Sequence, residues 1–164
     1  MLCVSSERRA QTMDRSKQIF AACVLLSASV FAAAQQNGYW RAASTNALAI
    51  TSDIAISARS LSINYEAFPL AEIRKLTPAE ASAAFDADLS AGGSGSLYRL
   101  NIPAAKRFVK KSPLCGSEDT QWMAAYVSGK TLTVTFFSGA DAPTLTFEAL
   151  NNATTRCGTF TYAR

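Results

Sequence analysis

The chain has 164 residues, of which 49% are hydrophobic and 17% charged, and its formal net charge is +4. This length suits one domain of ordinary size, and the apolar share excludes a wholly disordered chain. The sequence contains no histidine. It therefore lacks the commonest general base and the commonest neutral metal ligand, which disfavours enzymes that depend on either one.

The N-terminal region has the pattern of a cleavable secretory signal peptide. An uncharged apolar run, Ile19–Ala34, follows Arg15 and Lys17 and ends in small residues. This order of basic, apolar and small residues predicts cleavage between Ala34 and Gln35. A retained membrane anchor is the alternative, but the run is shorter than the roughly 20 residues that a bilayer span needs.

The second methionine, Met13, gives a signal peptide of ordinary length if translation begins there. We therefore expect Met13 rather than Met1 to be the true start. Residues 1–34 are expected to be an N-terminal extension and signal peptide, and residues 35–164 a single exported domain, periplasmic or secreted. Removal takes away four cations and two acids, so the net charge falls from +4 to +2. Nucleic-acid binding is not indicated, because such domains are usually far more basic.

Two cysteines, Cys115 and Cys157, remain in the expected mature domain. An even pair in an oxidising compartment predicts a disulfide. Closing the long loop between them would stabilise the fold by about 4 kcal/mol in the chain-entropy model. A metal site is the alternative, but it would lack histidine partners and the usual CxxC spacing. We expect no metal and no cofactor.

Alternation of apolar and polar residues with a period of two dominates the expected mature domain. It predicts strands over residues 60–65, 97–102, 131–136, 144–148 and 159–162. Shorter apolar runs predict further strands over residues 47–51, 54–57 and 122–127. One-sided wetting of this kind is typical of antiparallel sheets. The short connections at 58–59 and 128–130 indicate hairpins, so neighbours in sequence are expected to pair.

One helix is predicted within this β pattern. Thr77 and Glu80 have the spacing of a capping box, and Pro78 stands at the first helical position. The helix is expected over about 78–89 and to end at the glycine-rich segment 91–96. The chain is therefore predicted to be mainly β: a small antiparallel barrel or sandwich of about eight strands with one short inserted helix, preceded by a signal peptide.

Two segments that resemble catalytic motifs are incomplete. Gly92–Ser96 resembles a nucleophile elbow, but it lacks the final glycine, and no histidine exists to activate its central serine. Residues 128–131 end like a phosphate-binding loop, but the first glycine of that motif is absent and the segment joins two expected strands. We therefore expect a protein that is not an enzyme.

Four cations form the densest charge cluster of the expected mature domain: Lys106, Arg107, Lys110 and Lys111. Such a stretch would suit phosphates of lipopolysaccharide, acidic groups of peptidoglycan or an acidic protein. The alternative is a solvated edge strand or loop whose lysines prevent aggregation.

Three further residues are candidates for binding. Trp40 and Trp122 are expected to fill the core or to close one end of a barrel, because an indole buries a large apolar area and leaves one N–H to satisfy. Stacking on a ligand is the alternative for both. Asp53 lies between two apolar strand pieces. It is expected to cap a turn through its side chain, with direct contact to a ligand as the alternative.

Five segments carry a resemblance to known sequences: Tyr39-Trp40, Ala49–Ile54, Leu114–Gly116, Phe136–Gly139 and Cys157–Tyr162. Together they resemble a family of small exported proteins of Gram-negative bacteria to which no activity is assigned. The resemblance implies export and a Cys115–Cys157 bridge, and it transfers no activity. Ser52 stands where the related sequences have glycine.

The expected function is that of an exported, non-enzymatic binding module of the cell envelope, whose partner is an envelope polymer or a periplasmic protein. Looser architectural likenesses, to lipocalin-type carriers and to periplasmic inhibitors of hydrolases, give two alternatives. A carrier would hold a small apolar ligand inside the barrel, between side chains that alternate with polar ones: Leu61, Ile63, Leu132, Val134, Phe136 and Phe147. A monomer without a retained membrane span is expected.

Overall fold

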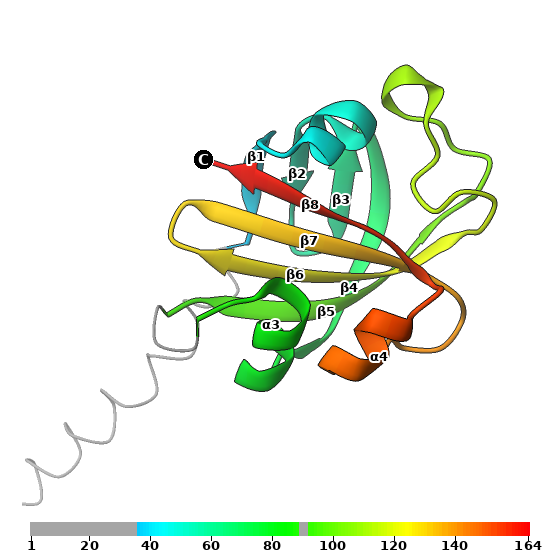
Figure 1. Cartoon of the computed structure of the whole chain (residues 1–164). Coiled ribbons are helices and arrows are strands. Elements are labelled where there is room, and N and C mark those ends of the chain that lie inside the picture. Colours follow the sequence, from blue (N-terminus) through cyan, green and yellow to red (C-terminus); the bar gives the residue numbers. More distant parts are fainter. Residues whose placement is uncertain (1–35, 89–91) are drawn as a thin grey trace, which may run out of the picture. The chain divides into compact units, whose positions relative to one another are not determined.

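The computed structural model describes residues 36–88 and 92–164, so the predicted signal peptide and its cleavage at Ala34 and Gln35 lie outside the described residues. Eight antiparallel strands form a closed barrel in which each strand pairs with its neighbour in sequence and β8 returns to β1 (Figure 1). The strands are β1 Gly38–Ala42, β2 Ile54–Ile56, β3 Ser60–Ile63, β4 Glu66–Lys75, β5 Ser94–Ile102, β6 Thr120–Ser128, β7 Thr131–Ser138 and β8 Arg156–Ala163. The predicted mainly β fold is confirmed, as a barrel rather than a sandwich.

Short helical segments connect some of the strands. They are the π-helix η1 Ala47–Thr51, the helix α3 Pro78–Phe85, the 3₁₀ turn η2 Val109–Lys111 and the helix α4 Phe147–Asn152. The predicted inserted helix is thus confirmed as α3. It ends at Phe85 rather than near residue 89, because Asp86 adopts a left-handed backbone conformation with φ 52°.

Alternation along the strands separates a filled barrel interior from the outer wall. In β6, Met123, Ala125 and Val127 belong to the interior cluster, whereas Trp122 and Ala124 belong to a second cluster. The largest fully buried side chains of the interior cluster are Trp40, Tyr162, Phe136, Phe160, Ile54, Leu61, Ile63, Ile102, Met123 and Leu132. These side chains pack the inside of the barrel, as a small eight-stranded barrel allows.

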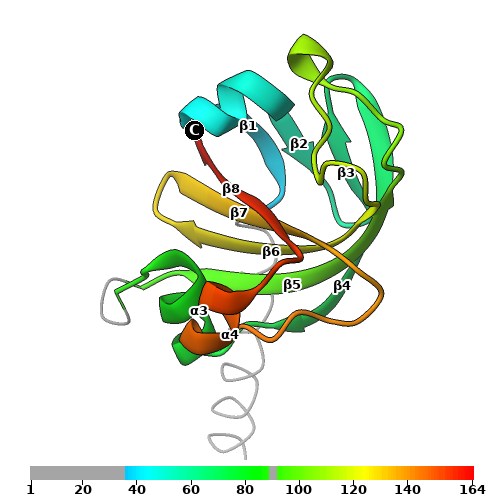
Figure 2. The ribbon, with the colours of Figure 1, turned by 45° about the vertical axis from the view of Figure 1, so that its right-hand side comes forward.

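Helices α3 and α4 lie side by side against one part of the barrel wall (Figure 2). The second cluster packs between that outer wall and the helices. It combines Leu97 of β5, Trp122 of β6 and Phe137 of β7 with Leu145 and Leu150 at and within α4. Residues at the end of α3 pack against the same cluster. The two helices therefore cover the part of the sheet where outward-facing positions are apolar.

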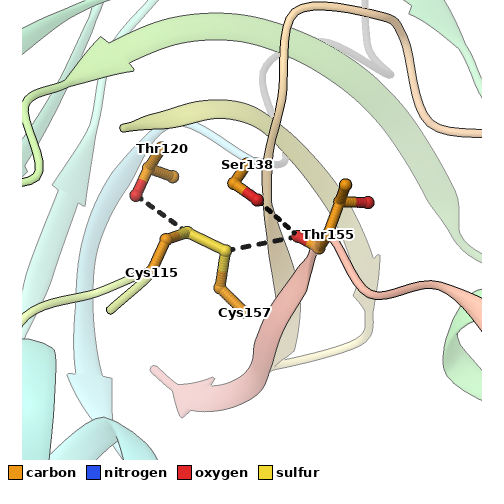
Figure 3. Close-up of a disulfide and its surroundings, with 5 residues drawn as sticks. All are labelled: Cys115, Thr120, Ser138, Thr155 and Cys157. Carbon is orange, nitrogen blue, oxygen red and sulfur yellow. Dashed lines mark hydrogen bonds between the residues drawn. A yellow bond between two sulfur atoms is a disulfide. The ribbon is translucent and has the colours of Figure 1, made fainter. Parts of the chain in front are cut away.

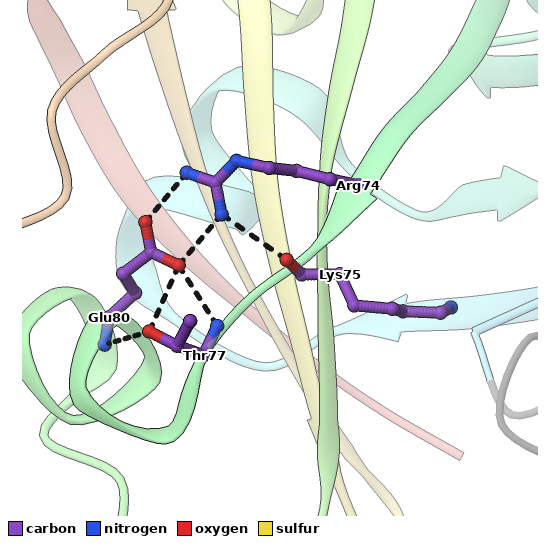
Figure 4. Close-up of polar contacts among 4 residues, drawn as sticks. All are labelled: Arg74, Lys75, Thr77 and Glu80. Carbon is purple, nitrogen blue, oxygen red and sulfur yellow. Dashed lines mark hydrogen bonds and ion pairs between the residues drawn. The ribbon is translucent and has the colours of Figure 1, made fainter.

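Arg74 and the capping box of α3 fix where this helix begins (Figure 4). The Glu80 carboxylate accepts hydrogen bonds from the backbone N–H of Thr77 at 2.9 Å and from its hydroxyl at 3.1 Å. Arg74 donates two further bonds to the same carboxylate, at 2.7 and 2.6 Å. The adjacent guanidinium is the main cause that lowers the pKa of Glu80 to about 2.

Two predicted strands are wrong. Residues 47–51 form the π-helix η1, in which the Ser52 N–H donates to the Ala47 carbonyl at 2.7 Å. Residues 144–148 lead into α4, whose N-cap Thr146 accepts from the Ala149 N–H at 3.3 Å. The Ala47 N–H also donates to the Ser44 hydroxyl at 3.2 Å. Local bonds to the side chains of Ser44 and Thr146 outweigh the apolar run at 47–51 and the alternation at 144–148.

Two strands were not predicted. Strand β1 is short and lies close to the expected cleavage site. Strand β4 contains Pro69 and several charged residues, so its sequence does not have the composition of a strand. It nevertheless pairs with β3 over Glu66–Pro69 and with β5 from Leu70 to Lys75, with a bulge between Glu72 and Arg74.

Candidate functional site

The outer wall of the barrel carries a groove of about 290 Å³ beside strands β1, β2 and β3. We call it the tyrosine groove, and define it by the residues that line it: Tyr39, Ser52, Asp53, Ile54, Ala55, Ser62, Asn64 and Tyr65. The two tyrosines are among the large aromatic side chains that remain exposed: Tyr39 is 60% exposed and Tyr65 fully so. Exposed aromatic rings beside a concave, partly polar surface are typical of ligand sites.

The strand register explains why the wall is hollowed here. Tyr39 of β1 lies opposite Ala55 of β2, and Ala55 lies opposite Ser62 of β3. Ser62 in turn lies opposite Ala67 of β4. A row of three small side chains therefore runs across neighbouring strands next to one large aromatic ring, and the low row forms the floor of the groove.

Asp53 holds the first tyrosine in place. Its carboxylate accepts a hydrogen bond from the Tyr39 hydroxyl and another from the Ala42 backbone N–H at 2.8 Å. These two bonds, with a smaller contribution from the charge of Arg41, lower the pKa of Asp53 below its ordinary value. The same bond to Asp53 raises the pKa of Tyr39. At neutral pH the groove therefore contains a carboxylate and a protonated phenol.

The backbone of the groove is strained in two places, the Asn64-Tyr65 turn and Ser52. Asn64 and Tyr65 both have positive φ, 49° and 67°, as in the tight primed turn of a hairpin between β3 and β4. Asparagine suits this conformation, whereas a bulky tyrosine is rare in it. Ser52 has φ 54° and ψ −153°, a region that is populated almost only by glycine. Strained residues of this kind gather at binding sites, and each costs about 1–3 kcal/mol.

The structure places one of the sequence candidates, Asp53, in this groove. Asp53 does not cap its own turn; its side chain reaches back to Tyr39 and Ala42. Neither tyrosine was predicted from the sequence as a binding residue. The local signal that points to Tyr65 is Asn64, a residue that favours turns, directly after the alternating segment that ends at Ile63; the aromatic residue then lies at the tip of a hairpin turn.

The basic stretch forms a loop with η2 rather than an edge strand. Lys106 forms an ion pair with Glu66 of β4. Arg107 donates to the carbonyls of Ala104 and Lys106 at 2.5 and 2.9 Å, within its own loop. Two of the four cations therefore hold the loop together, while Lys110 and Lys111 are exposed on η2.

The same loop covers one end of the barrel. Phe108 and Leu114 are buried in the interior cluster, and Phe108 packs edge to face on Phe68 with ring centroids 6.0 Å apart. The loop is fixed at its far end by a disulfide between Cys115 and Cys157, as predicted, with the two Cα atoms 4.8 Å apart.

A polar shell surrounds this disulfide (Figure 3). The Thr120 hydroxyl donates to Sγ of Cys115 at 3.0 Å, and the Ser138 hydroxyl donates to the Thr155 carbonyl at 3.3 Å. Sγ of Cys157 lies 3.4 Å from the same carbonyl. Because a disulfide sulfur carries no proton, this last approach is a nonbonded contact. The disulfide thus joins the loop to β8 at the rim of the barrel.

Both tryptophans are buried. Trp40 is 0% exposed, its indole N–H donates to the Gln36 carbonyl at 2.9 Å, and the Arg164 guanidinium lies 3.9 Å above its ring. Trp40 therefore sits where a plug of the barrel is expected. Trp122 is 8% exposed and packs on the outer wall, with Arg99 4.6 Å above its ring. Neither ring lines the tyrosine groove.

The expected lining of a carrier is only partly in place. Five of the six residues lie in the interior cluster, where they pack against one another. The predicted place of Phe147 in the interior lining is wrong, because this residue begins α4 on the outer wall and is 71% exposed. A second, more open groove lies between α3 and α4, and Phe147 lines it together with Ala83 and Asp86.

Within residues 36–88 and 92–164, no group of three or more acidic or cysteine side chains is arranged to hold a metal ion. In the same described part of the chain, no helix has the length and apolar character needed to cross a membrane. No protein-family model, curated protein or solved structure matches this chain.

Proposed function

We propose that the protein is an exported, non-enzymatic binding module of the cell envelope, and that the tyrosine groove is its ligand site. The observation that carries this proposal is the pair of exposed rings, Tyr39 and Tyr65, in one groove with the ionised Asp53. Exposed aromatic rings are unfavourably hydrated, and contact with a ligand removes part of their apolar surface from water.

The groove is organised before any ligand arrives. Tyr39 is tied to Asp53 by its hydroxyl, and Tyr65 stands in a tight turn between two paired strands. A site whose side chains are already oriented loses little conformational entropy on binding. The backbone strain at Ser52 and Tyr65 is consistent with this role, because strained residues often hold a binding site in its bound geometry.

The chemistry of Asp53 favours binding over catalysis. A general acid or base works best when its pKa lies near the working pH. The pKa of Asp53 is lowered, and its two hydrogen bonds both favour the charged form. Such a carboxylate accepts hydrogen bonds from a ligand and does not exchange protons with it near neutral pH.

The barrel interior supports a carrier less well than the groove supports a surface binder. The interior holds large side chains such as Trp40, Phe136 and Tyr162, all of them fully buried. A ligand of drug-like size needs roughly 300–1,000 Å³. A ligand inside would have to displace these aromatic rings from their packing.

The experiment is cosedimentation of the oxidised protein, produced from the full chain, with isolated cell envelopes of a Gram-negative bacterium. Tyr65→Ala and Tyr39→Ala are compared with Lys110→Ser/Lys111→Ser as the matched surface control. We expect each tyrosine variant to weaken binding at least tenfold and the lysine variant to bind like wild type. Unfolding curves check that the variants fold.

Equal binding by wild type and both tyrosine variants would refute the groove as the ligand site. Loss in the lysine variant alone would transfer the site to the basic loop.

A further inference from the structure

The tyrosine groove also restricts the chemical class of its ligand. Resting on the proposed function, we infer that the groove binds an uncharged sugar ring of an envelope glycan. The charge, the hydrogen-bonding groups and the size of the lining all fit such a ring.

The charge of the lining disfavours anionic ligands. Asp53 is the ionised residue among those that line the groove, and no lysine or arginine is among them. Arg41 is the neighbouring cation that acts on Asp53, and it leaves the carboxylate charged. A phosphate or carboxylate in the groove would stand close to a like charge in a partly desolvated place, which is unfavourable. This excludes the anionic groups that the basic loop suggested.

The free hydrogen-bonding groups match the hydroxyls of a sugar. Among the described residues of the lining, the side chains of Ser52, Ser62 and Asn64 make no hydrogen bond to the protein. Asp53 adds acceptor capacity, because a carboxylate takes more than the two bonds that it already accepts. The serine hydroxyls and the Asn64 amide both donate and accept. Neighbouring hydroxyls of a sugar ring require this mixture.

The aromatic rings supply the apolar part of the contact. A sugar ring has one face of C–H bonds, and this face packs on the electron-rich face of an aromatic ring. Tyr39 and Tyr65 offer such faces, and Ala55 offers a low apolar floor between the strands. The volume of about 290 Å³ lies at the lower end of ligand sites and suits one ring rather than a bulky ligand.

The test is calorimetric or NMR titration of the full-chain protein with two defined probes of equal length. Triacetylchitotriose is uncharged, and trigalacturonic acid carries one carboxylate per ring. We expect the neutral trisaccharide to bind at least tenfold more tightly than the anionic one. Tyr65→Ala should weaken binding of the neutral probe at least tenfold, because one stacking face is lost.

Asp53→Asn separates the charge from the shape of the site. This variant keeps an acceptor and the side-chain volume, but it removes the negative charge. We expect the preference for the neutral over the anionic probe to shrink at least fivefold. Ala58→Ser, in the exposed β2–β3 turn outside the groove, serves as the matched control and should bind both probes like wild type.

The outcomes distinguish the two claims. If envelope binding requires the tyrosines but neither trisaccharide binds, the site stands and the sugar assignment fails. Tighter binding of the anionic probe overturns the assignment as well. If envelope binding ignores the tyrosines, the proposed function itself fails.

Discussion

The hydroxyl of Tyr39 donates a hydrogen bond to the carboxylate of Asp53, fourteen residues further along the chain. This bond joins the outer face of β1 to the residue before β2, next to the position where η1 ends at the strained Ser52. It lowers the pKa of the carboxyl and fixes the edge of an exposed ring. One contact therefore sets both the charge and the shape of the tyrosine groove.

Tyr39→Phe tests this relationship without removing the ring. The lost bond is the main cause of the lowered pKa, so we expect the pKa of Asp53 to rise toward its ordinary value of 3.8. The remaining bond from Ala42 keeps it below that value. A carboxyl ¹³C titration measures both proteins. An unchanged pKa would show that the Tyr39 bond is not formed in solution.

Glu80→Gln tests the cap of α3. The pKa of Glu80 is lowered to about 2 from 4.5, so its ion pair stabilises the fold fully above pH 4.5 and this stability is lost as the pH falls toward 2. Arg74 is 42% exposed, and solvent screening limits the expected effect to about 1 kcal/mol.

Denaturant unfolding of wild type and Glu80→Gln at several pH values checks this expectation. The difference between them should be constant above pH 5 and should shrink toward pH 2. A difference that grows on acidification has the wrong sign for this ion pair. Glu148→Gln, on the other outer helix, is the matched control.

The disulfide is expected to dominate the stability of the rim. It closes a loop of 42 residues, so its reduction should lower the free energy of unfolding by about 4 kcal/mol. Cys115→Ser/Cys157→Ser should show the same loss in urea unfolding. It should also make residues 103–114 more sensitive to limited proteolysis, because the loop then keeps only the burial of Phe108 and Leu114 and its polar contacts, such as the Lys106–Glu66 ion pair. A loss below 1 kcal/mol would contradict this role.

Ser52→Gly is expected to stabilise the protein. The backbone conformation at Ser52 costs a non-glycine residue about 1–3 kcal/mol of folding free energy. Glycine removes this strain, but its greater freedom in the unfolded chain costs about 0.5–1 kcal/mol on folding. The net gain should be about 1 kcal/mol in thermal or urea unfolding. A less stable variant would show that the Ser52 hydroxyl or its neighbours compensate for the strain.

Much of the fold follows from the sequence, because most strands alternate in a barrel with a filled interior and a wet outer wall. The predicted number of strands, about eight, agrees with the structure partly because errors cancel. Residues 47–51 form η1 and residues 144–148 lead into α4, so these two predicted strands are absent and offset the two strands that were missed, β1 and β4. In β4, pairing with β3 over its first four residues and with β5 over the rest overrides Pro69 and the charges.

The candidate site was less predictable. Asp53 was a candidate because a lone acid between two apolar strand pieces is expected to cap a turn or to contact a ligand, and the structure places it in the groove. Tyr39 and Tyr65 come together only through the register of β1, β2 and β3 and the turn that follows. Strand order and register depend on pairing across the chain, and a local pattern does not contain them.

The most direct test of the central claim is an amide NMR titration of the ¹⁵N-labelled protein with the uncharged trisaccharide triacetylchitotriose. A ligand in the tyrosine groove should shift the amide signals of residues 38–42, 52–55 and 62–66, and leave those of the interior and of 106–111 in place. The largest shifts at 106–111, or among interior residues such as Phe136, would contradict the account.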